Sequence, residues 1–262
     1  MLRATIARLK QGHRTIPYPA EEPVLPDRFR GLPVLDSARC ADDCRACADA
    51  CPTEAIIREG AVNPAGAGLR LDLGRCLFCT DCQEACPAGA IRYTQDYRLA
   101  ARNRQDLVLD GQTLKLASAL NEKSRRVFGR SLKLRQVSAA GCNACEADLN
   151  VLSTVVFDLG RFGIQFVASP RHADGIVVTG PVSENMRTAL LETYAAIPAP
   201  KLAIAVGACA VSGGPYAGNP EIHNGCEALL PVDLYIPGCP PHPLTILDGL
   251  LRLLGQIEGD RR

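Results

Sequence analysis

Tryptophan is absent from this 262-residue chain, and aromatic residues make up only 5% of it. The formal net charge is +1, so the chain lacks the basic excess and the stacking residues typical of nucleic-acid-binding proteins. No apolar run approaches the roughly 18–20 residues that span a bilayer. The first residues lack the continuous apolar segment of a secretory signal. We therefore expect no nucleic-acid partner, no secretion and no membrane span.

Catalytic motifs are also lacking. The chain shows no nucleophile with its base, no acid–base pair and no nucleotide-binding loop, and Gly213-Gly214 lacks phosphate-loop spacing. We therefore expect no turnover from the chain alone beyond redox exchange. The histidines lie in no metal-ligand spacing and are predicted to be structural or at the surface: His13, His172, His223 and His242.

Cysteine, in contrast, is abundant. Eight of the 13 cysteines fall between Cys40 and Cys86, and five fall between Cys142 and Cys239. An odd count in tight CxxC spacing is typical of metal ligation and not of a disulfide framework. Ligation by thiolates needs reduced cysteines, which indicates the cytoplasm. A hydrophobic content of 47% is enough for a folded core.

Residues 39–92 contain an internal repeat. The segment Cys51-Pro-Thr-Glu-Ala-Ile56 recurs 35 residues later as Cys86-Pro-Ala-Gly-Ala-Ile91. The second half reads Cys76-x2-Cys79-x2-Cys82-x3-Cys86-Pro87, a spacing typical of ferredoxins with two [4Fe–4S] clusters. The first half reads Cys40-x3-Cys44-x2-Cys47-x3-Cys51-Pro52, with one residue more in its first gap.

In such ferredoxins the fourth cysteine of each half ligates the cluster of the other half. This crossover predicts one cluster on Cys40, Cys44, Cys47 and Cys86, and a second on Cys51, Cys76, Cys79 and Cys82. The longer gap leaves open whether the first cluster has four irons or three. Two zinc ions in a redox-inactive assembly module are the alternative, which the Cys-Pro ends and the repeat disfavour. About 55 residues bury little apolar surface, so we expect the clusters to stabilise this fold.

From about residue 134 the pattern changes to alternating strands and helices. We expect buried parallel strands over 163–167, 175–178, 202–206 and 232–236, and helices over 183–197 and 244–257. The alternation predicts an α/β fold, a doubly wound, flavodoxin-like parallel sheet, preceded by a small α+β two-cluster ferredoxin domain.

A third cluster is predicted in this second half. Cys209 and Cys239 each follow a predicted strand, and loops at the carboxyl ends of parallel strands converge on ligands. Cys142 and Cys145 supply two further thiolates. Cys226 has no spacing partner and is predicted not to be a ligand.

Arg171 precedes the predicted strand over 175–178. We expect it near the third cluster, where its positive charge would raise the reduction potential. An ion pair with Asp174 is an equal alternative.

The expected organisation has four segments. These are an N-terminal helix and extended lead-in over 1–38, the two-cluster ferredoxin domain over 39–95, a linker over 96–133 and the α/β domain over 134–262. The first helix would carry Leu2, Ile6 and Leu9 on one face, with basic residues opposite. It would lie on a membrane surface or a membrane protein, or pack within its own complex, and both remain open.

Several segments resemble a known family. Gly141–Glu146, Phe166–Asp174, Val178–Val182 and Val232–Pro241 resemble the small subunit of membrane-bound [NiFe] hydrogenases of the formate-hydrogenlyase and hydrogenase-4 type, which is homologous to the B subunit of respiratory complex I. Tyr18–Pro23, Phe29–Pro33 and both cysteine motifs resemble the two-cluster ferredoxin subunit of the same complexes, which is similar to the I subunit of complex I. The chain thus resembles a fusion of two electron-transfer subunits.

The resemblance implies a non-catalytic subunit of an oxidoreductase complex that relays electrons through three [4Fe–4S] clusters. Cys142, Cys145, Cys209 and Cys239 would hold the cluster proximal to the large subunit's active site, and Glu146 would lie near it at that interface. The implied partners are the large subunit, membrane-arm subunits and an upstream electron-carrying subunit or soluble ferredoxin. The implied location is cytoplasmic, on the inner face of the cell membrane through these partners.

A complex I-like NADH/quinone oxidoreductase, with quinone at the proximal cluster, is the alternative. The B subunit of complex I usually has two adjacent cysteines where this chain has Cys142 and Cys145 separated by two residues. That difference favours the hydrogenase-like branch.

Overall fold

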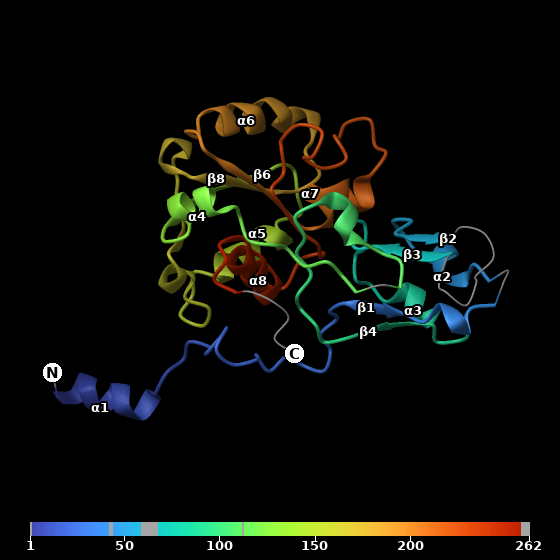
Figure 1. The fold of residues 1–262 in the computed structure, drawn as a ribbon, viewed down its shortest axis with the longest axis horizontal. Helices are drawn as coiled ribbons and strands as arrows, with labels where there is room; N and C mark the ends of the chain where they lie inside the picture. Colours follow the sequence, from blue (N-terminus) through green and yellow to red (C-terminus); the bar gives the residue numbers. More distant parts are fainter. Residues whose placement is uncertain (1, 42–43, 59–67, 112, 258–262) are drawn as a thin grey trace.

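The computed structural model in Figure 1 describes all residues except 1, 42–43, 59–67, 112 and 258–262. Its larger part is built on a five-stranded parallel sheet in the order β10-β9-β8-β6-β7. Counted from β6 as the first strand, this is the order 2-1-3-4-5 of doubly wound flavodoxin-like folds. The predicted fold class is therefore confirmed. The strands are β6 (Leu132–Ser138), β7 (Ile164–Phe166), β8 (Gly175–Thr179), β9 (Leu202–Val206) and β10 (Leu234–Ile236).

Four of these strands match the expected apolar runs, whereas β6 was not predicted. It pairs with β7 on one side and β8 on the other, so it lies where the strand order reverses. Its burial is interrupted: Lys133 is exposed between the buried Leu132 and Leu134, and Arg135 is half-buried. Two basic side chains broke the apolar pattern by which buried strands are recognised.

Helices cover both faces of this sheet. On one face, α6 (Glu184–Ala195) and α7 (Ala208–Ser212) pack on side chains such as Ile176 and Val178. On the other face, α4 (Glu122–Phe128), α5 (Ala144–Val151) and α8 (Pro243–Leu253) pack on Val177 and its neighbours. Successive strand residues point to opposite faces, which is why neighbouring residues enter different cores.

The smaller part consists of short antiparallel pairs. β1 (Pro33–Leu35) pairs with β4 (Ile91–Tyr93), and β3 (Leu69–Asp72) pairs with both β2 (Ile56–Arg58) and β5 (Val108–Leu109). Two one-turn helices, α2 (Ala46–Asp49) and α3 (Asp81–Glu84), contact each other. Because β2 and β4, and likewise α2 and α3, occupy equivalent repeat positions, the sequence repeat is also a structural one.

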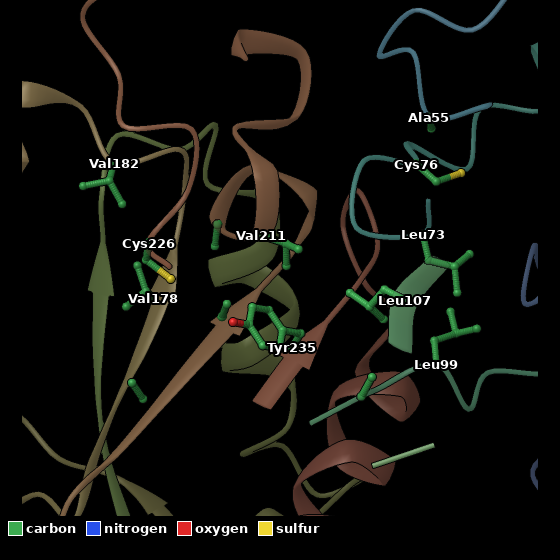
Figure 2. Close-up of a cluster of buried hydrophobic side chains, with 14 of the residues drawn as sticks. Ala55, Leu73, Cys76, Leu99, Leu107, Val178, Val182, Val211, Cys226 and Tyr235 are labelled. Atoms are coloured by element: carbon green, nitrogen blue, oxygen red, sulfur yellow. The ribbon is translucent and has the colours of Figure 1, made fainter. Parts of the chain in front are cut away.

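One buried apolar cluster joins the two parts. It runs from Leu73, Leu99 and Leu107 beside β3 to Val178 and Tyr235 in the large sheet (Figure 2). Residues of the predicted linker over 96–133 take part, since Ala101 and Tyr235 exchange backbone hydrogen bonds of 3.0 and 2.9 Å. The segment is therefore packed against the large sheet at this point.

The N-terminal segment has two different environments. Helix α1 (Leu2–Gln11) has no buried residue and extends away from the body (Figure 1). Further on, the Tyr18 hydroxyl donates a hydrogen bond of 2.9 Å to Asp248 of α8, which also pairs with Arg252 at 2.8 Å.

Among the described residues, every helix is too short or too polar to span a membrane. Short 3₁₀ turns complete the fold: η1 (Ser37–Arg39), η2 (Arg104–Leu107), η3 (Leu159–Phe162), η4 (Pro170–His172) and η5 (Gly214–Tyr216).

Candidate metal centres

The first predicted cysteine set comes together around α2. Cys47 is buried at its centre, and burial, followed by the charges of Cys86, Cys40 and Cys44, raises the pKa of the Cys47 thiol to about 11. Cys86, from the second repeat, therefore lies with three cysteines of the first. This is the grouping that the crossover predicts.

The second set comes together around α3. One small cavity is lined by all four of its cysteines, Cys51, Cys76, Cys79 and Cys82, together with Tyr93. Burial is the largest cause of the raised pKa of Cys76, about 12, with smaller contributions from Cys82 and Cys51. That these sets hold clusters stays a prediction, but the structure gives each set four converging thiols.

Backbone amides point at the sulfurs of both sets. Ala55 donates to Cys51 Sγ at 3.2 Å, and Ala90, its repeat equivalent, donates to Cys86 Sγ at 3.2 Å. Phe78 donates to Cys76 Sγ at 3.3 Å. Such N–H···S bonds stabilise thiolates and cluster sulfurs, which carry negative charge. The donors therefore fit an all-thiolate cluster.

The third set lies at the carboxyl edge of the large sheet. Cys142 and Cys145 follow β6, Cys209 lies in α7 after β9, and Cys239 follows β10. All four line one cavity. Burial is the largest cause of the raised pKa of Cys145, and the charges of Cys209, Glu146, Cys239 and Cys142 follow.

Two glycines leave room for these sulfurs. A Cβ on Gly207 would come within 2.5 Å of Cys145 Sγ, and one on Gly214 would come within 2.9 Å of Cys209 Sγ. Gly207 also has a φ of +89°, which favours glycine. The glycine positions, the all-sulfur donor set and the cavity fit a [4Fe–4S] cluster, whose binding would displace the thiol protons.

The two other predicted site residues lie at opposite edges of the large sheet. Glu146 is 5% exposed, lines the third cavity and accepts a hydrogen bond of 2.6 Å from Thr179 Oγ1. Arg171, in contrast, is exposed in η4, at the amino end of β8. The cysteines lie at the opposite, carboxyl edge, so the expectation that Arg171 lies near this cavity is corrected. A residue that precedes a parallel strand cannot lie beside residues that follow its neighbours. Asp174 accepts a hydrogen bond from the Lys133 amide at 2.7 Å.

Cys226 lies in the apolar core, close to Val178 and Val182 (Figure 2). It is 1% exposed, and burial raises its pKa to about 12. It lines neither the second nor the third cysteine cavity among the described residues. This environment supports the prediction that Cys226 is not a ligand.

The second and third sets face each other across one cleft. Leu77 and Phe78, between the ligands of the second set, line it from one side, and Cys239 and Pro240 line it from the other. Burial is the largest cause of the raised pKa of Cys239, followed by the charges of Cys142 and Cys79. The charge of Cys79 therefore reaches Cys239 across the cleft, although their loops belong to different parts of the chain.

Three site residues were not predicted. Arg30 donates hydrogen bonds of 3.1 Å to the carbonyl oxygens of both Phe78 and Cys79. The Tyr93 hydroxyl lies 3.5 Å from Cys76 Sγ and 3.7 Å from Cys82 Sγ. Arg58 donates a hydrogen bond of 2.8 Å to the carbonyl oxygen of Ala41, next to Cys40. Aligning the repeats could have found two of them, since Arg58 and Tyr93 occupy the same repeat position.

Two family models match this chain, one in the α/β part and one in the ferredoxin part. Residues 142–253 match the family model "NADH ubiquinone oxidoreductase, 20 Kd subunit", and residues 39–90 match a 4Fe-4S dicluster domain.

Relatives of the α/β part come from two kinds of complex. Formate hydrogenlyase subunit 7 of Escherichia coli is 42% identical over 129 residues, which cover 49% of this chain and 51% of the relative. The probable membrane-bound hydrogenase subunit mbhJ of Pyrococcus furiosus is 36% identical over 50% of this chain and 79% of its own length. The B subunit of the NADH-quinone oxidoreductase of Bacteroides thetaiotaomicron is 37% identical over 58% and 83%.

A solved structure, of the archaeal membrane-bound sulfane sulfur reductase, aligns with a TM-score of 0.46 at 31% identity. The alignment covers 54% of this chain and 78% of that one. The chain thus spans about half the length of the Escherichia coli relative and about four fifths of the other two relatives.

Proposed function

The chain belongs to the family of the NADH ubiquinone oxidoreductase 20 Kd subunit, which includes hydrogenase small subunits, with a 4Fe-4S dicluster domain before it; on this premise we propose that it is the electron-relay subunit of a membrane-associated [NiFe]-hydrogenase-like complex. It would hold three [4Fe–4S] clusters, each of which takes up and releases one electron at a time. The observation that carries the proposal is that 12 of the 13 cysteines form three groups of four.

The chain's own residues hold and order these sites. The packed core that the two parts share keeps the second and third cysteine sets facing each other across the cleft between Phe78 and Cys239. Arg30, bonded to the carbonyls of Phe78 and Cys79, fastens the loop on one side. The first set lies around α2, which is farther from the large sheet (Figure 1). The proposed relay order is therefore first set, second set, third set.

The third set is also where a partner would act. Cys142 and Cys239 are exposed, whereas Cys209 is buried. We propose that the large subunit, which carries the active site, covers this exposed edge and that Glu146 lies just behind the interface. Membrane-arm subunits, and an upstream electron carrier or soluble ferredoxin at the first set, complete the proposed partners. The proposed location is the cytoplasmic face of the cell membrane, reached through those subunits.

A second candidate is the equivalent subunit of a complex I-like quinone oxidoreductase. It is favoured by relatives in NADH-quinone oxidoreductases that are 37–41% identical to this chain. The two-residue separation of Cys142 and Cys145 favours the hydrogenase-like assignment.

The first test is the content of iron, acid-labile sulfide and zinc in the full chain purified without oxygen, with electron paramagnetic resonance (EPR) spectra of the reduced protein. We expect about twelve irons with matching sulfide per chain. Zinc without sulfide would overturn the electron-transfer function. Nickel and hydrogen evolution in the purified complex would support the hydrogenase-like assignment, and quinone reduction without nickel would support the alternative.

A further inference from the structure

The segments that carry the second and third cysteine sets touch at a buried glycine. Gly74 lies in the turn between β3 and Cys76 of the second set. A Cβ on Gly74 would come within 2.7 Å of Val211 Cγ1, on α7, two residues after Cys209 of the third set. Carbon atoms in contact lie about 3.5–4.0 Å apart. The two segments can therefore approach this closely only because residue 74 has no side chain.

Backbone conformation does not require this glycine, because Gly74 is not among the residues with a positive φ. Its turn is nevertheless held firmly. The Gly74 amide donates a hydrogen bond of 2.8 Å to the Asp72 carboxylate, which accepts two more from Arg104, of 2.7 and 2.6 Å. The Cys76 amide donates to the Asp72 carbonyl oxygen at 3.1 Å. A displacement of Gly74 would therefore carry Cys76 with it.

Two groups would meet a side chain at residue 74, and neither is free to move away. Arg104 Cζ would lie within 2.7 Å of the added Cβ, and the Arg104 guanidinium is held in its largely buried pair with Asp72. Val211 is buried in the apolar cluster that joins the two parts (Figure 2). Ser212 Oγ adds a polar contact, 2.9 Å from the Gly74 carbonyl oxygen. The contact is therefore close and fixed on both sides.

Helix α7 connects this contact to two ligands of the third set. It carries Cys209, and the amide of Ala208 donates a hydrogen bond of 2.8 Å to the carbonyl oxygen of Gly238, next to Cys239. Elsewhere the second and third sets face each other across the cleft of about 370 Å³. Contact at Gly74 and open space at the cleft mean that the size of residue 74 decides how closely the two sets approach.

We propose that Gly74 is a positioning residue, which sets the separation of the second and third sets and thereby the rate at which their clusters exchange electrons. The inference rests on the proposed function. In this step one electron leaves the reduced second cluster and enters the oxidised third cluster, and no bond forms or breaks. The rate falls steeply with separation because electronic coupling decays exponentially through protein. A side chain at residue 74 would push α7 and the Cys76 turn apart while every ligand stays in place.

The test is EPR of the full chain, purified and reduced without oxygen, with iron counted in each sample. Two reduced clusters interact magnetically, and this interaction weakens steeply with their separation. The part of the interaction that is absent from Cys142→Ala, which should lack the third cluster, belongs to the second and third clusters. Gly74→Ala should retain about twelve irons and weaken that part. It should also slow electron transfer from the second to the third cluster several-fold, measured by rapid-freeze EPR after a pulse of reductant.

Two further variants separate positioning from general damage. Gly74→Ala combined with Val211→Ala removes the methyl groups that the new Cβ would meet, so it should recover most of the wild-type interaction and rate. Ser212→Ala loses only the hydroxyl beside the Gly74 carbonyl oxygen and should weaken the interaction by less than Gly74→Ala does.

Gly160→Ala is the matched control. Gly160 also lacks a positive φ, and the nearest atom to an added Cβ is Asp158 Oδ1, at 4.0 Å. It should change neither the interaction nor the rate. The inference is overturned if Gly74→Ala with all its iron behaves as the wild type does, if the double variant recovers nothing, or if Gly160→Ala gives an equal change. If Gly74→Ala loses iron, the double variant and Ser212→Ala decide the outcome. A wild-type chain without clusters would instead overturn the proposed function.

Discussion

The ferredoxin part and the α/β part present the same thiol groups by opposite means. In the ferredoxin part, strands of two to four residues and four-residue helices surround eight cysteines. In the α/β part, four cysteines lie at the edge of a five-stranded sheet, and every residue of the eleven-residue helix α8 is buried. We therefore expect the proposed clusters to stabilise the first part, whereas the second part has a large apolar core of its own.

The largest expected effect concerns removal of the metal. If iron is removed by chelation under oxidising conditions, the amides of β2, β3 and α3 should lose protection from hydrogen exchange, because that part buries too little apolar surface alone. The amides of β8, β9 and α8 should remain protected. Hydrogen-exchange mass spectrometry of the full chain measures both. Equal protection of both parts without iron would show that the ferredoxin part depends on bound metal no more than the α/β part does.

Single ligand substitutions sharpen the same contrast. Cys82→Ala and Cys142→Ala should each lose about four of about twelve irons. Only Cys82→Ala should also lower the hydrogen-exchange protection of its own part, since Cys142 lies on the exposed edge of a preformed sheet. Cys226→Ala is the control and should retain all the iron. Loss of iron in Cys226→Ala would show that this buried thiol is a ligand.

The third site can be blocked without touching a ligand. Gly207→Ala places a Cβ within 2.5 Å of Cys145 Sγ and should remove the third cluster while the ferredoxin clusters remain. Gly218→Ala is matched to it, because Gly218 also has a positive φ, of +83°, but has nothing within 4 Å of the added Cβ. Both variants should lose about 1–3 kcal/mol of stability from backbone strain. Gly207→Ala should therefore contain fewer irons than Gly218→Ala. Equal iron counts would contradict the proposed cluster site beside Gly207.

The smallest effect concerns the N-terminal lead-in, which is fastened to the α/β part. Tyr18→Phe removes the hydrogen bond to the buried Asp248 carboxylate and should lower the free energy of unfolding of that part by about 1.5–3 kcal/mol. Iron content should not change. Tyr216→Phe, at an exposed position, should have an effect within about 0.5 kcal/mol. Denaturant unfolding followed by circular dichroism measures both effects. Loss of iron from the ferredoxin sites in Tyr18→Phe would show that the lead-in stabilises the ferredoxin part instead.

Much of the fold follows from local pattern. The apolar runs that became β8 and β9 are wholly buried, and the helix predicted over 183–197 forms as α6, with Ser183 at its N-cap position. β6 could not be found in this way. It is the strand that pairs on both sides at the point where the order reverses, yet it carries Lys133 and Arg135, so its place depends on strands far away in sequence.

By itself, the sequence predicted the three cysteine sets: local spacing and the repeat indicated two of them, and the positions of Cys209 and Cys239 after predicted strands indicated the third. Tertiary structure decided what surrounds those sets. It placed Arg171 at the wrong edge of the sheet for a role beside the third set, and it brought Arg30 to the loop of Phe78. It also placed Phe78 and Cys239 on the same cleft. The reason is physical: ligand spacing is set along the backbone, whereas the charges and contacts around a site depend on which distant segments pack together.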